Sequence, residues 1–390
     1  MNESHATASD SIMIIAGEVS GDLHASGLIK AFGELEPNIR FFGVGGERMK
    51  DAGCENVYSV DDVAFVGFTE VIQHLPFIYR MRKTLLNECL AKKPRAVVLV
   101  DYPGFNLNFA QKLRKHPLLK DTPVLYYISP QVWAWHASRI KKIARLVDRL
   151  AVIFDFEVPL YREAGLKTDF VGHPLLEVTA SSLTNEEFRH SLGAELGIPL
   201  LGLLPGSRLQ EIRRLLPVFL ETYLYLKKEI PDIKTAIACS PAVEESIYQD
   251  IMDHFGTAVD NIPLLYNQTA DLQAHSDVVL VASGTATLET AILGTPLVMA
   301  YRVSPITYLI GKKLVKIPHI ALVNVVAGKK IIPEFIQGQA TPDNISEELG
   351  NILNDSNRCD SMKADLEQVK EKLGSAGASD NVAKILQSMI

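Results

Sequence analysis

The chain has 390 residues, of which 47% are hydrophobic and 22% are charged. This length exceeds one ordinary domain, so two domains of similar size are expected. The net charge of −7 argues against nucleic acid as the main partner, because proteins that bind it usually carry a basic excess. The four cysteines fit no metal-ligand spacing, which indicates free thiols in a reducing compartment and no bound metal.

Residues 1–10 are polar and lack the basic and apolar parts of a signal peptide, so they predict a disordered tail. No apolar run approaches the ~18 residues that a membrane-spanning helix needs. These features predict a cytoplasmic protein that is at most attached to a membrane face.

From residue 11 onward, short apolar runs alternate with helical patterns. The run 11–16 ends in a glycine-bearing turn at 17–21, and a helix is expected from about 21 to 35. This succession opens doubly wound α/β domains, and continued alternation predicts a parallel sheet covered on both faces. Further strands are expected at 39–44, 96–100, 123–128, 150–154 and 169–171, and helices at 105–114 and 137–147.

The alternation then starts again, which predicts a second domain of the same kind. Its expected strands are 200–204, 235–238, 278–281 and 296–300, and its expected helices are 210–228, 243–254 and 286–293. The predicted organisation is therefore two Rossmann-like domains, 11–172 and 173–345, followed by charged helices at 346–390. A cleft between two such domains is a natural ligand site, since ligands bind beyond the carboxyl ends of parallel strands.

Two turns of the second domain have the composition of anion sites. The turn with Gly206, Ser207 and Arg208 follows an apolar strand and precedes a long helix, so its N–H groups and guanidinium suit a phosphate. The alternative is a serine cap beside a surface arginine. In the turn Ser283–Thr285, small residues allow a ligand to approach, and Glu289 one helical turn later suits ribose hydroxyls. The alternative there is a tight helix start with an ordinary acidic residue.

Polar residues also follow two strands of the first domain. Asp101 comes directly after the apolar strand 96–100, where a partly desolvated carboxylate can serve as a general base or simply cap the next helix. The first turn carries Glu18, Ser20, Asp22 and His24. Helix capping accounts for Ser20 and in part for Asp22, but not for the other two.

The stretch 63–86 is unusually apolar for a surface segment and ends in basic residues, which suits an element that dips into a membrane. The alternative is a core helix with a charged end, and Pro76 predicts a helix–loop–helix. The apolar members are Phe65, Val66, Phe68, Val71, Leu75, Phe77 and Ile78, and the basic ones include Arg82 and Lys83. A second basic group contains Arg302, Lys312, Lys313 and Lys316, which can receive a phosphate or a membrane surface; the alternative, and the commoner meaning of such runs, is solvated surface lysines.

The motifs AGEVSGDLH, GVGGERM, VDYPGFN, YYISPQVWAW, VGHPL, LPGSRLQEI and SGTATLE occur in this order, followed by ALVN and PEFIQ. Together they resemble the lipid-A-disaccharide synthase family over about residues 11–337. The resemblance implies the GT-B fold, in which two Rossmann-like domains face a cleft and the C-terminal helices pack back on the N-terminal half. It implies no cofactor and no metal.

The resemblance also implies an activity. UDP-2,3-diacylglucosamine and 2,3-diacylglucosamine 1-phosphate would give the β-1,6-linked disaccharide 1-phosphate and UDP by inverting displacement. Asp101 matches the essential aspartate, as the base, and Glu18, Ser20, Asp22 and His24 belong to the acceptor side. The donor side would comprise Gly206, Ser207, Arg208, Ser283, Gly284, Thr285 and Glu289, with Asn324, Glu334 and Gln337 as polar residues lining the cleft.

The resemblance further implies partners and location: a UDP-sugar lipid donor, an acylated sugar-phosphate acceptor, and the cytoplasmic face of the inner membrane of a Gram-negative cell. The stretch 63–86 matches the segment with which the family approaches the membrane. For the oligomeric state, a homodimer is one alternative. Two alternatives are a GT-B enzyme of another pathway, such as a peptidoglycan-precursor transferase or a UDP-sugar 2-epimerase, and a catalytically silent UDP-sugar-binding module. A binding module would not need Asp101, and neither rival enzyme would need so apolar a stretch.

Overall fold

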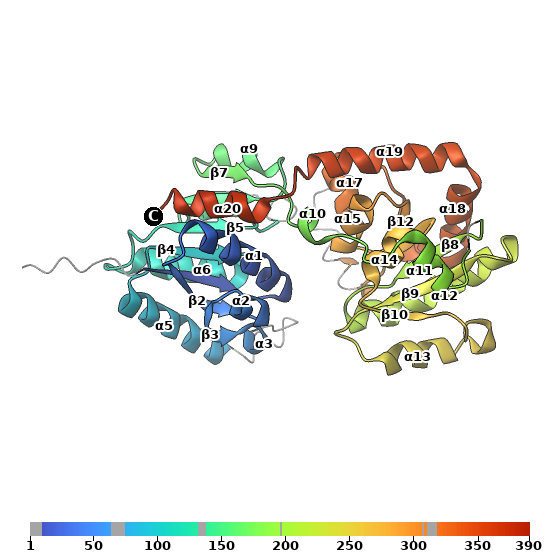
Figure 1. Ribbon diagram of the computed structural model, residues 1–390, viewed down its shortest axis with the longest axis horizontal. Helices are drawn as coiled ribbons and strands as arrows, with labels where there is room; N and C mark the ends of the chain where they lie inside the picture. Colours follow the sequence, from blue (N-terminus) through green and yellow to red (C-terminus); the bar gives the residue numbers. More distant parts are fainter. Residues whose placement is uncertain (1–9, 64–74, 132–137, 196, 306–307, 310–317) are drawn as a thin grey trace, which may run out of the picture. The chain divides into compact units, whose positions relative to one another are not determined.

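The structure is a computed structural model that describes residues 10–63, 75–131, 138–195, 197–305, 308–309 and 318–390 (Figure 1). Residue contacts divide the chain into two compact units. The first unit is Met1–Glu177 together with Gly374–Ile390, and the second is Val178–Leu373. Within the described residues, no helix is both long and apolar enough to cross a bilayer.

The first unit is built on a seven-stranded parallel sheet with the order β3-β2-β1-β4-β5-β6-β7. Its strands are β1 (Ser11–Ala16), β2 (Arg40–Gly45), β3 (Glu55–Ser59), β4 (Ala96–Val100), β5 (Val124–Tyr127), β6 (Arg149–Val152) and β7 (Lys167–Phe170). Its helices are α1 (Val19–Leu35), α2 (Glu47–Asp51), α3 (Val60–Val63), α5 (Leu75–Lys92), α6 (Pro103–Lys115), α8 (Ser138–Ala144), α9 (Glu157–Arg162), α10 (Leu175–Val178), which ends at the unit boundary, and α20 (Ala378–Gln387).

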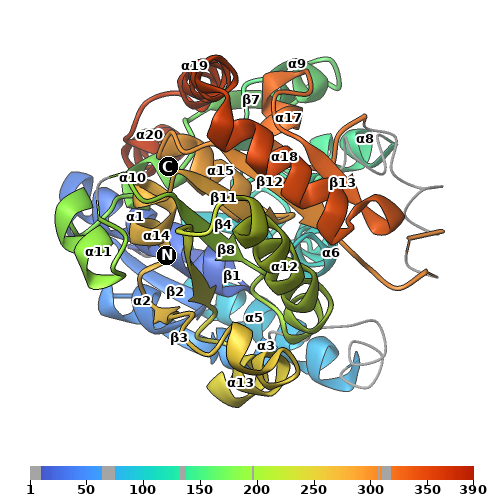
Figure 2. The same ribbon diagram turned by 90° about the vertical axis from the view of Figure 1, so that its right-hand side faces the viewer.

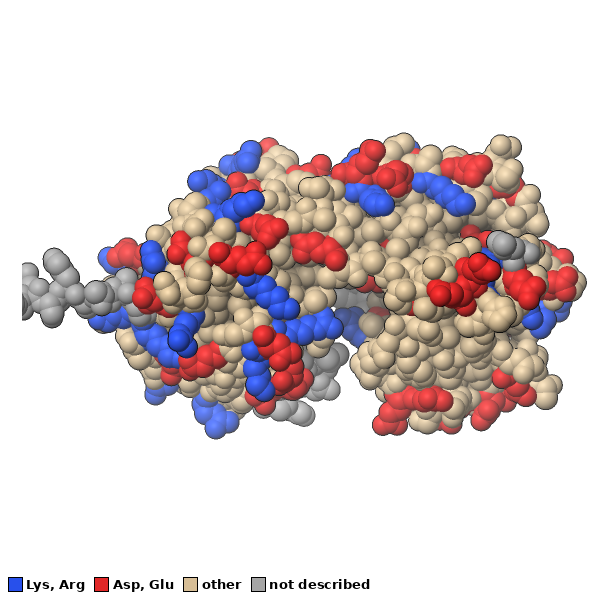
Figure 3. All heavy atoms as spheres, viewed as in Figure 1, with Lys and Arg blue, Asp and Glu red and all other residues tan. Residues whose placement is uncertain are grey.

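Both faces of this sheet are buried, as the uninterrupted apolar strands predict. Along β1, Met13 and Ile15 join one core and Ile12 and Ile14 join another, because successive strand residues point to opposite faces. The second of these cores is completed by α20, which packs along α1 (Figure 1). Basic and acidic side chains alternate over the face of this unit that Figure 3 shows.

The second unit has a six-stranded parallel sheet with the order β10-β9-β8-β11-β12-β13. Its strands are β8 (Leu200–Leu204), β9 (Lys234–Cys239), β10 (Leu264–Tyr266), β11 (Val278–Ala282), β12 (Leu297–Tyr301) and β13 (Glu334–Ile336). Its helices are α11 (Asn185–Ser191), α12 (Leu209–Glu229), α13 (Glu245–Asp253), α14 (Thr269–His275), α15 (Thr285–Ile292), α17 (Leu322–Ala327), α18 (Pro342–Asn354) and α19 (Ser356–Lys372), with short 3₁₀ turns at Gly256–Ala258 and Gln337–Gln339.

The C-terminal stretch is divided between the units, which differs from the predicted boundary at 345/346. Helix α18 packs on α12 (Figure 2) and α19 packs on α15 and α17, so both belong to the second unit. Only the segment 374–390 folds with the first unit. The physical reason is amphipathicity, because each helix buries its apolar side chains on the nearest uncovered face.

Candidate active site

A pocket of about 350 Å³ opens in the second unit where β8, β9 and β11 end. The carboxyl ends of neighbouring parallel strands are the usual ligand position in such sheets. Seven of the residues predicted for the donor side line this pocket: Gly206, Ser207, Arg208, Ser283, Gly284, Thr285 and Glu289. The two turns singled out in the sequence thus meet at one site.

The turn after β8 is held in shape by Glu211, which the sequence motifs did not single out. Its carboxylate accepts the Ser207 N–H at 3.1 Å and lies 3.4 Å from the guanidinium of Arg208. Gly206 has φ of +124°, and a Cβ there would come within 2.6 Å of Glu211, so glycine is required on both counts. The Arg208 side chain is 69% exposed and therefore able to reach an anion in the pocket.

The turn after β11 leads into α15. Gly284 is the residue before this helix and has φ of +150°, and the Thr287 hydroxyl donates to its backbone oxygen at 2.8 Å. The N-termini of α12 and α15 therefore both open onto the pocket, and each presents backbone N–H groups that have no partner within the helix. Two such termini and an arginine favour a ligand with two adjacent phosphates.

Glu289 faces the pocket from the second turn of α15. Burial raises the pKa of Glu289, while a hydrogen bond from the Gln273 side chain lowers it. Gln273 is itself buried, and its amide donates to the Ala286 oxygen and the Thr290 hydroxyl. Glu289 is thus a half-buried carboxylate of fixed position. A carboxylate held in this way is suited to accept hydrogen bonds from two adjacent hydroxyl groups, such as those of a ribose.

The other three residues predicted for the donor side, Asn324, Glu334 and Gln337, do not line this pocket. Asn324 is fully buried, and its amide bonds with the backbone at 331–332 and with the Glu334 carboxylate. Glu334 also accepts two backbone N–H groups of the preceding loop, and Gln337 bonds both backbone groups of Val303. Their polar atoms stabilise loops of the second unit, since buried polar groups must find partners.

Asp101 lies directly beyond β4 in the first unit, in a strained backbone. Asp101 and Tyr102 have φ of +43° and +46°, which is the left-handed region that non-glycine residues seldom adopt. The Asp101 backbone oxygen accepts from the Tyr126 hydroxyl at 2.6 Å and from the buried Asn106 amide at 2.8 Å. The Asp101 N–H donates to the Tyr127 oxygen at 3.0 Å. Three contacts therefore fix the position of this residue.

The electrostatic setting of Asp101 raises the pKa of its carboxylate. Burial, and secondly the negative charge of Glu18, raise the pKa of Asp101 to about 6, although a hydrogen bond from the Tyr102 backbone opposes this. Glu18 is exposed in the turn after β1. Gly17 beside it leaves room for the Tyr102 ring, because a Cβ on Gly17 would lie 2.2 Å from that ring. A carboxylate with its pKa near the working pH is suited to accept a proton.

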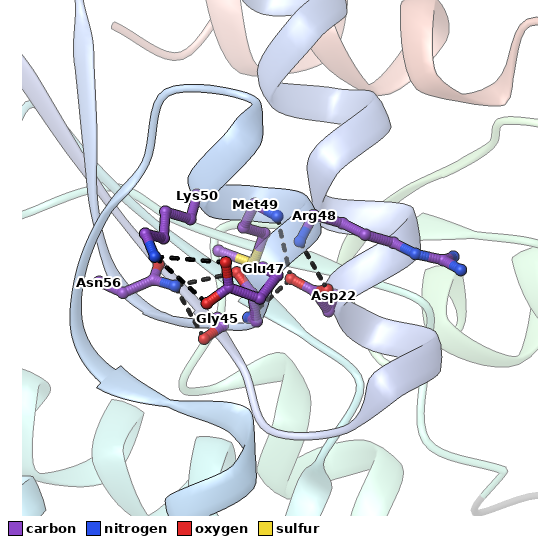
Figure 4. A network of polar contacts seen from close by, with 8 residues as sticks. Asp22, Gly45, Glu47, Arg48, Met49, Lys50 and Asn56 are labelled. Carbon is purple, nitrogen blue, oxygen red and sulfur yellow. Dashed lines mark hydrogen bonds and ion pairs between the residues drawn. The ribbon is translucent and has the colours of Figure 1, made fainter. Parts of the chain in front are cut away.

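The remaining residues of the first turn have different roles. Glu18, not Ser20, is the residue before α1, so Ser20 is not the predicted cap and instead lies exposed in the first turn of the helix. Asp22 caps a second helix: its buried carboxylate accepts the N–H groups of Gly46, Arg48 and Met49 at the start of α2, at 2.7 to 3.3 Å (Figure 4). Asp22 therefore fixes the start of α2 against α1. Burial lowers the pKa of His24 to about 4, so its ring is neutral near pH 7.

Of the predicted membrane segment 63–86, Val63 ends α3 and residues 75–86 belong to α5, which has Pro76 in its first turn. Phe77 and Ile78 pack partly against the core, whereas Leu75 is 53% exposed. Lys83 is exposed, and Arg82 donates to Asn108 and stacks over the ring of Tyr79. The residues Phe65, Val66, Phe68 and Val71 lie outside the described residues.

The sequence matches a family model described as Lipid-A-disaccharide synthetase over residues 12–388. The chain belongs to this family. The lipid-A-disaccharide synthase of Geobacter sulfurreducens is 41% identical over 379 residues, which cover 97% of each chain. That of Myxococcus xanthus is 38% identical over 380 residues with the same coverage.

Solved structures of other proteins share the fold of this chain. MnaA of S. aureus, in a co-structure with UDP, aligns with a TM-score of 0.66 at 12% identity and covers 97% of both chains. MurG of Acinetobacter baumannii aligns with a TM-score of 0.58 at 15% identity over 97% of this chain and 99% of its own. The two parallel sheets are thus those of the predicted GT-B fold. As a member of its family, the protein is a glycosyltransferase of lipid A disaccharide formation.

Proposed function

We propose that the enzyme transfers 2,3-diacylglucosamine from its UDP derivative to the 6-hydroxyl of 2,3-diacylglucosamine 1-phosphate. The products are the β-1,6-linked disaccharide 1-phosphate and UDP. Family membership supports this proposal, together with a pocket in the second unit that suits a nucleoside diphosphate. The observation that carries it is Asp101, a carboxylate whose pKa is raised to about 6 and whose backbone is fixed beyond a central strand.

In this mechanism, the Asp101 carboxylate removes the proton of the acceptor's 6-hydroxyl as that oxygen attacks C1 of the donor sugar. The bond from C1 to the phosphate oxygen breaks, and UDP leaves with the electron pair. Attack from the face opposite to an α-linked UDP gives a β-linkage, so the configuration inverts. The proton stays on Asp101 until solvent accepts it.

The leaving diphosphate gains negative charge in the transition state, and preorganised donors stabilise such charge. In this proposal the donors are Arg208 and the backbone N–H groups at the starts of α12 and α15. Glu289 accepts the ribose hydroxyls and thereby fixes the distance of the diphosphate from the helix termini. Removal of the Arg208 guanidinium is expected to weaken both UDP binding and turnover.

An assay of the wild-type enzyme and of Asp101→Asn tests the proposal. Both radiolabelled substrates are supplied in mixed micelles, and disaccharide and UDP are quantified. We expect equal amounts of both products from the wild type, and a loss of about 10²-fold or more in kcat for Asp101→Asn with its UDP affinity kept. UDP without disaccharide would indicate another acceptor, and a variant of nearly full rate would remove Asp101 from the mechanism. Binding of the UDP-sugar without turnover would favour a binding module.

We propose further that the enzyme works at the cytoplasmic face of the inner membrane, where lipid substrates of this kind reside. The start of α5 supports this, since Leu75 and Tyr79 are 53% and 60% exposed and lie beside basic side chains. Co-sedimentation with anionic vesicles tests the idea. The double variant Leu75→Glu and Tyr79→Glu is expected to lose vesicle binding while its UDP affinity stays unchanged, and unchanged vesicle binding would refute this location for the contact.

A further inference from the structure

Arg48 lies in α2, directly after the turn that ends β2, and its backbone is held rigidly. Its N–H donates to the Asp22 carboxylate, which also binds the N–H groups of Gly46 and Met49. Asp22 is only 5% exposed, and a Cβ on Gly46 would lie 2.6 Å from one of its oxygens. The start of α2 is therefore a fixed platform from which one long cationic side chain projects.

The charges around Arg48 leave its guanidinium available. The neighbouring Glu47 pairs with Lys50 at 3.2 Å, and Asp22 is occupied by backbone N–H groups. Figure 4 shows the Arg48 side chain extending away from this network. Within the described part of the chain, its guanidinium has no ion pair and no hydrogen bond to another residue, and Arg48 is exposed. A guanidinium on a rigid platform without a carboxylate partner is suited to bind a phosphate.

His24, in the second turn of α1, is a second donor within electrostatic reach of Arg48. The ring is half-buried, and burial lowers its pKa to about 4 although Glu177 raises it, with Arg48 as a smaller lowering cause, so the ring is neutral near pH 7 and carries one N–H. Of the nearby carboxylates, Glu177 is engaged by the N–H groups of Gly377 and Ser379 and by the Ser379 hydroxyl. These donors fix the Glu177 carboxylate in position, so Arg48 supplies the positive charge of the subsite and His24 only a neutral N–H.

The order of strands sets the distance from this pair to the proposed base. Arg48 follows β2, His24 follows β1 and Asp101 follows β4, and these three strands are adjacent in the sheet. Neighbouring strands lie about 4.8 Å apart, so the ends of β2 and β4 are separated by roughly 10 Å. The side chains of Arg48 and Asp101 are long enough to reduce this separation to the span of one hexose from its 6-hydroxyl to a phosphate on C1. Arg48 and Asp101 closely follow the carboxyl ends of their strands, where ligands bind, and His24 lies in the second turn of α1.

We propose that Arg48, with His24 beside it, is the subsite for the 1-phosphate of the acceptor. This inference rests on the proposed reaction, in which Asp101 receives the 6-hydroxyl proton at the other end of the same sugar. The other cations considered for this role are less suitable or undescribed. The Arg302 guanidinium donates to the Ala340 oxygen at 2.6 Å, and Lys312, Lys313 and Lys316 lie outside the described residues.

The test compares two acceptors, 2,3-diacylglucosamine 1-phosphate and the same lipid without its phosphate, in mixed micelles. Arg48→Gln removes the cation from an exposed position, and Lys50→Gln on the same helix is the matched control with the same charge change. For each protein, kcat/KM is measured with both acceptors, and their equilibrium binding is measured without donor. We expect the preference for the phosphorylated acceptor to fall about 10- to 100-fold in Arg48→Gln, because that is the usual effect of losing one charged hydrogen-bonding partner. In Lys50→Gln the preference should stay unchanged.

The outcomes separate this inference from the proposed reaction. An Arg48→Gln enzyme that keeps its preference, or a Lys50→Gln enzyme that loses it equally, overturns the subsite. A wild-type protein that makes no disaccharide contradicts the proposed reaction. The binding measurement then still decides on Arg48, because a wild type that binds both lipids equally well overturns the subsite independently. Reduced discrimination in binding and in turnover, confined to Arg48→Gln, supports it.

Discussion

The variant Asp101→Asn is expected to lose activity and, at the same time, to have a higher free energy of unfolding than the wild type. The pKa of Asp101 is raised from 3.8 to about 6, so the folded state binds the proton more tightly than the unfolded state. Above pH 6 the ionised carboxylate therefore lowers the free energy of unfolding, by about 1.4 kcal/mol per pKa unit and about 3 kcal/mol in total. Asp101→Asn removes this cost, because an amide does not ionise.

The pH dependence gives the sign of the effect. As the pH falls from 6 to 3.8, Asp101 becomes protonated in the folded state first, and the advantage of Asp101→Asn shrinks. Below 3.8 both states carry the proton, and the two proteins should differ little. The expected profile is thus a gain of about 3 kcal/mol above pH 6 that declines to near zero in acid.

Urea unfolding followed by far-UV circular dichroism measures this difference. Asp121→Asn, at an exposed aspartate of the first unit, is the control and should change the unfolding free energy by less than about 0.5 kcal/mol. An Asp101→Asn protein no more stable than the wild type above pH 6 would refute the reasoning, and so would a gain that persists in acid.

Three further results are expected. Glu18→Gln removes a negative charge that raises the pKa of the base, so the acid limb of the pH–rate profile should move to lower pH, and a limb that stays in place contradicts this. Glu289→Gln should weaken UDP binding about 10- to 100-fold in calorimetry but hardly affect 2′,3′-dideoxy-UDP; equal losses would exclude ribose recognition. Gly17→Ala should displace the Tyr102 ring and lower the free energy of unfolding by about 1–3 kcal/mol, with a loss of much of the turnover. The control Gly104→Ala, where a Cβ meets open space, should change neither stability nor turnover.

Strands were predictable where they are central and fully apolar. Residues 96–100 and 200–204 form β4 and β8 at the predicted positions, since strands covered on both faces need continuous apolar side chains. The edge strand β3 (Glu55–Ser59) was not predicted because it is only half-buried and carries polar residues. The short strands β10 and β13, of three residues each, give no periodic signal at all.

Within the site, turn chemistry was predictable and long-range contacts were not. Gly206 and Gly284 are recognisable because turns at helix starts need backbone that approaches a ligand or adopts positive φ. Gln273, by contrast, is a single amide in an ordinary helical pattern, and only the fold reveals that it abuts Glu289. Asn324 had a polar signal like that of a ligand contact, yet its partners are backbone groups and the Glu334 carboxylate, which the sequence does not identify.

The connectivity of the first unit has a consequence for biosynthesis. Helix α20 contributes Val382 and Leu386 to the core that also contains Leu28 and Phe32 of α1. The ribosome, however, must synthesise the whole of Val178–Leu373 between these two parts, which takes roughly 10–40 s at about 5–20 residues per second. For that interval, nascent α1 keeps an uncovered apolar face while the second unit can already complete its own sheet. The unit that begins first is therefore completed last, and its exposed α1 face is the region of the nascent chain that most needs protection from aggregation.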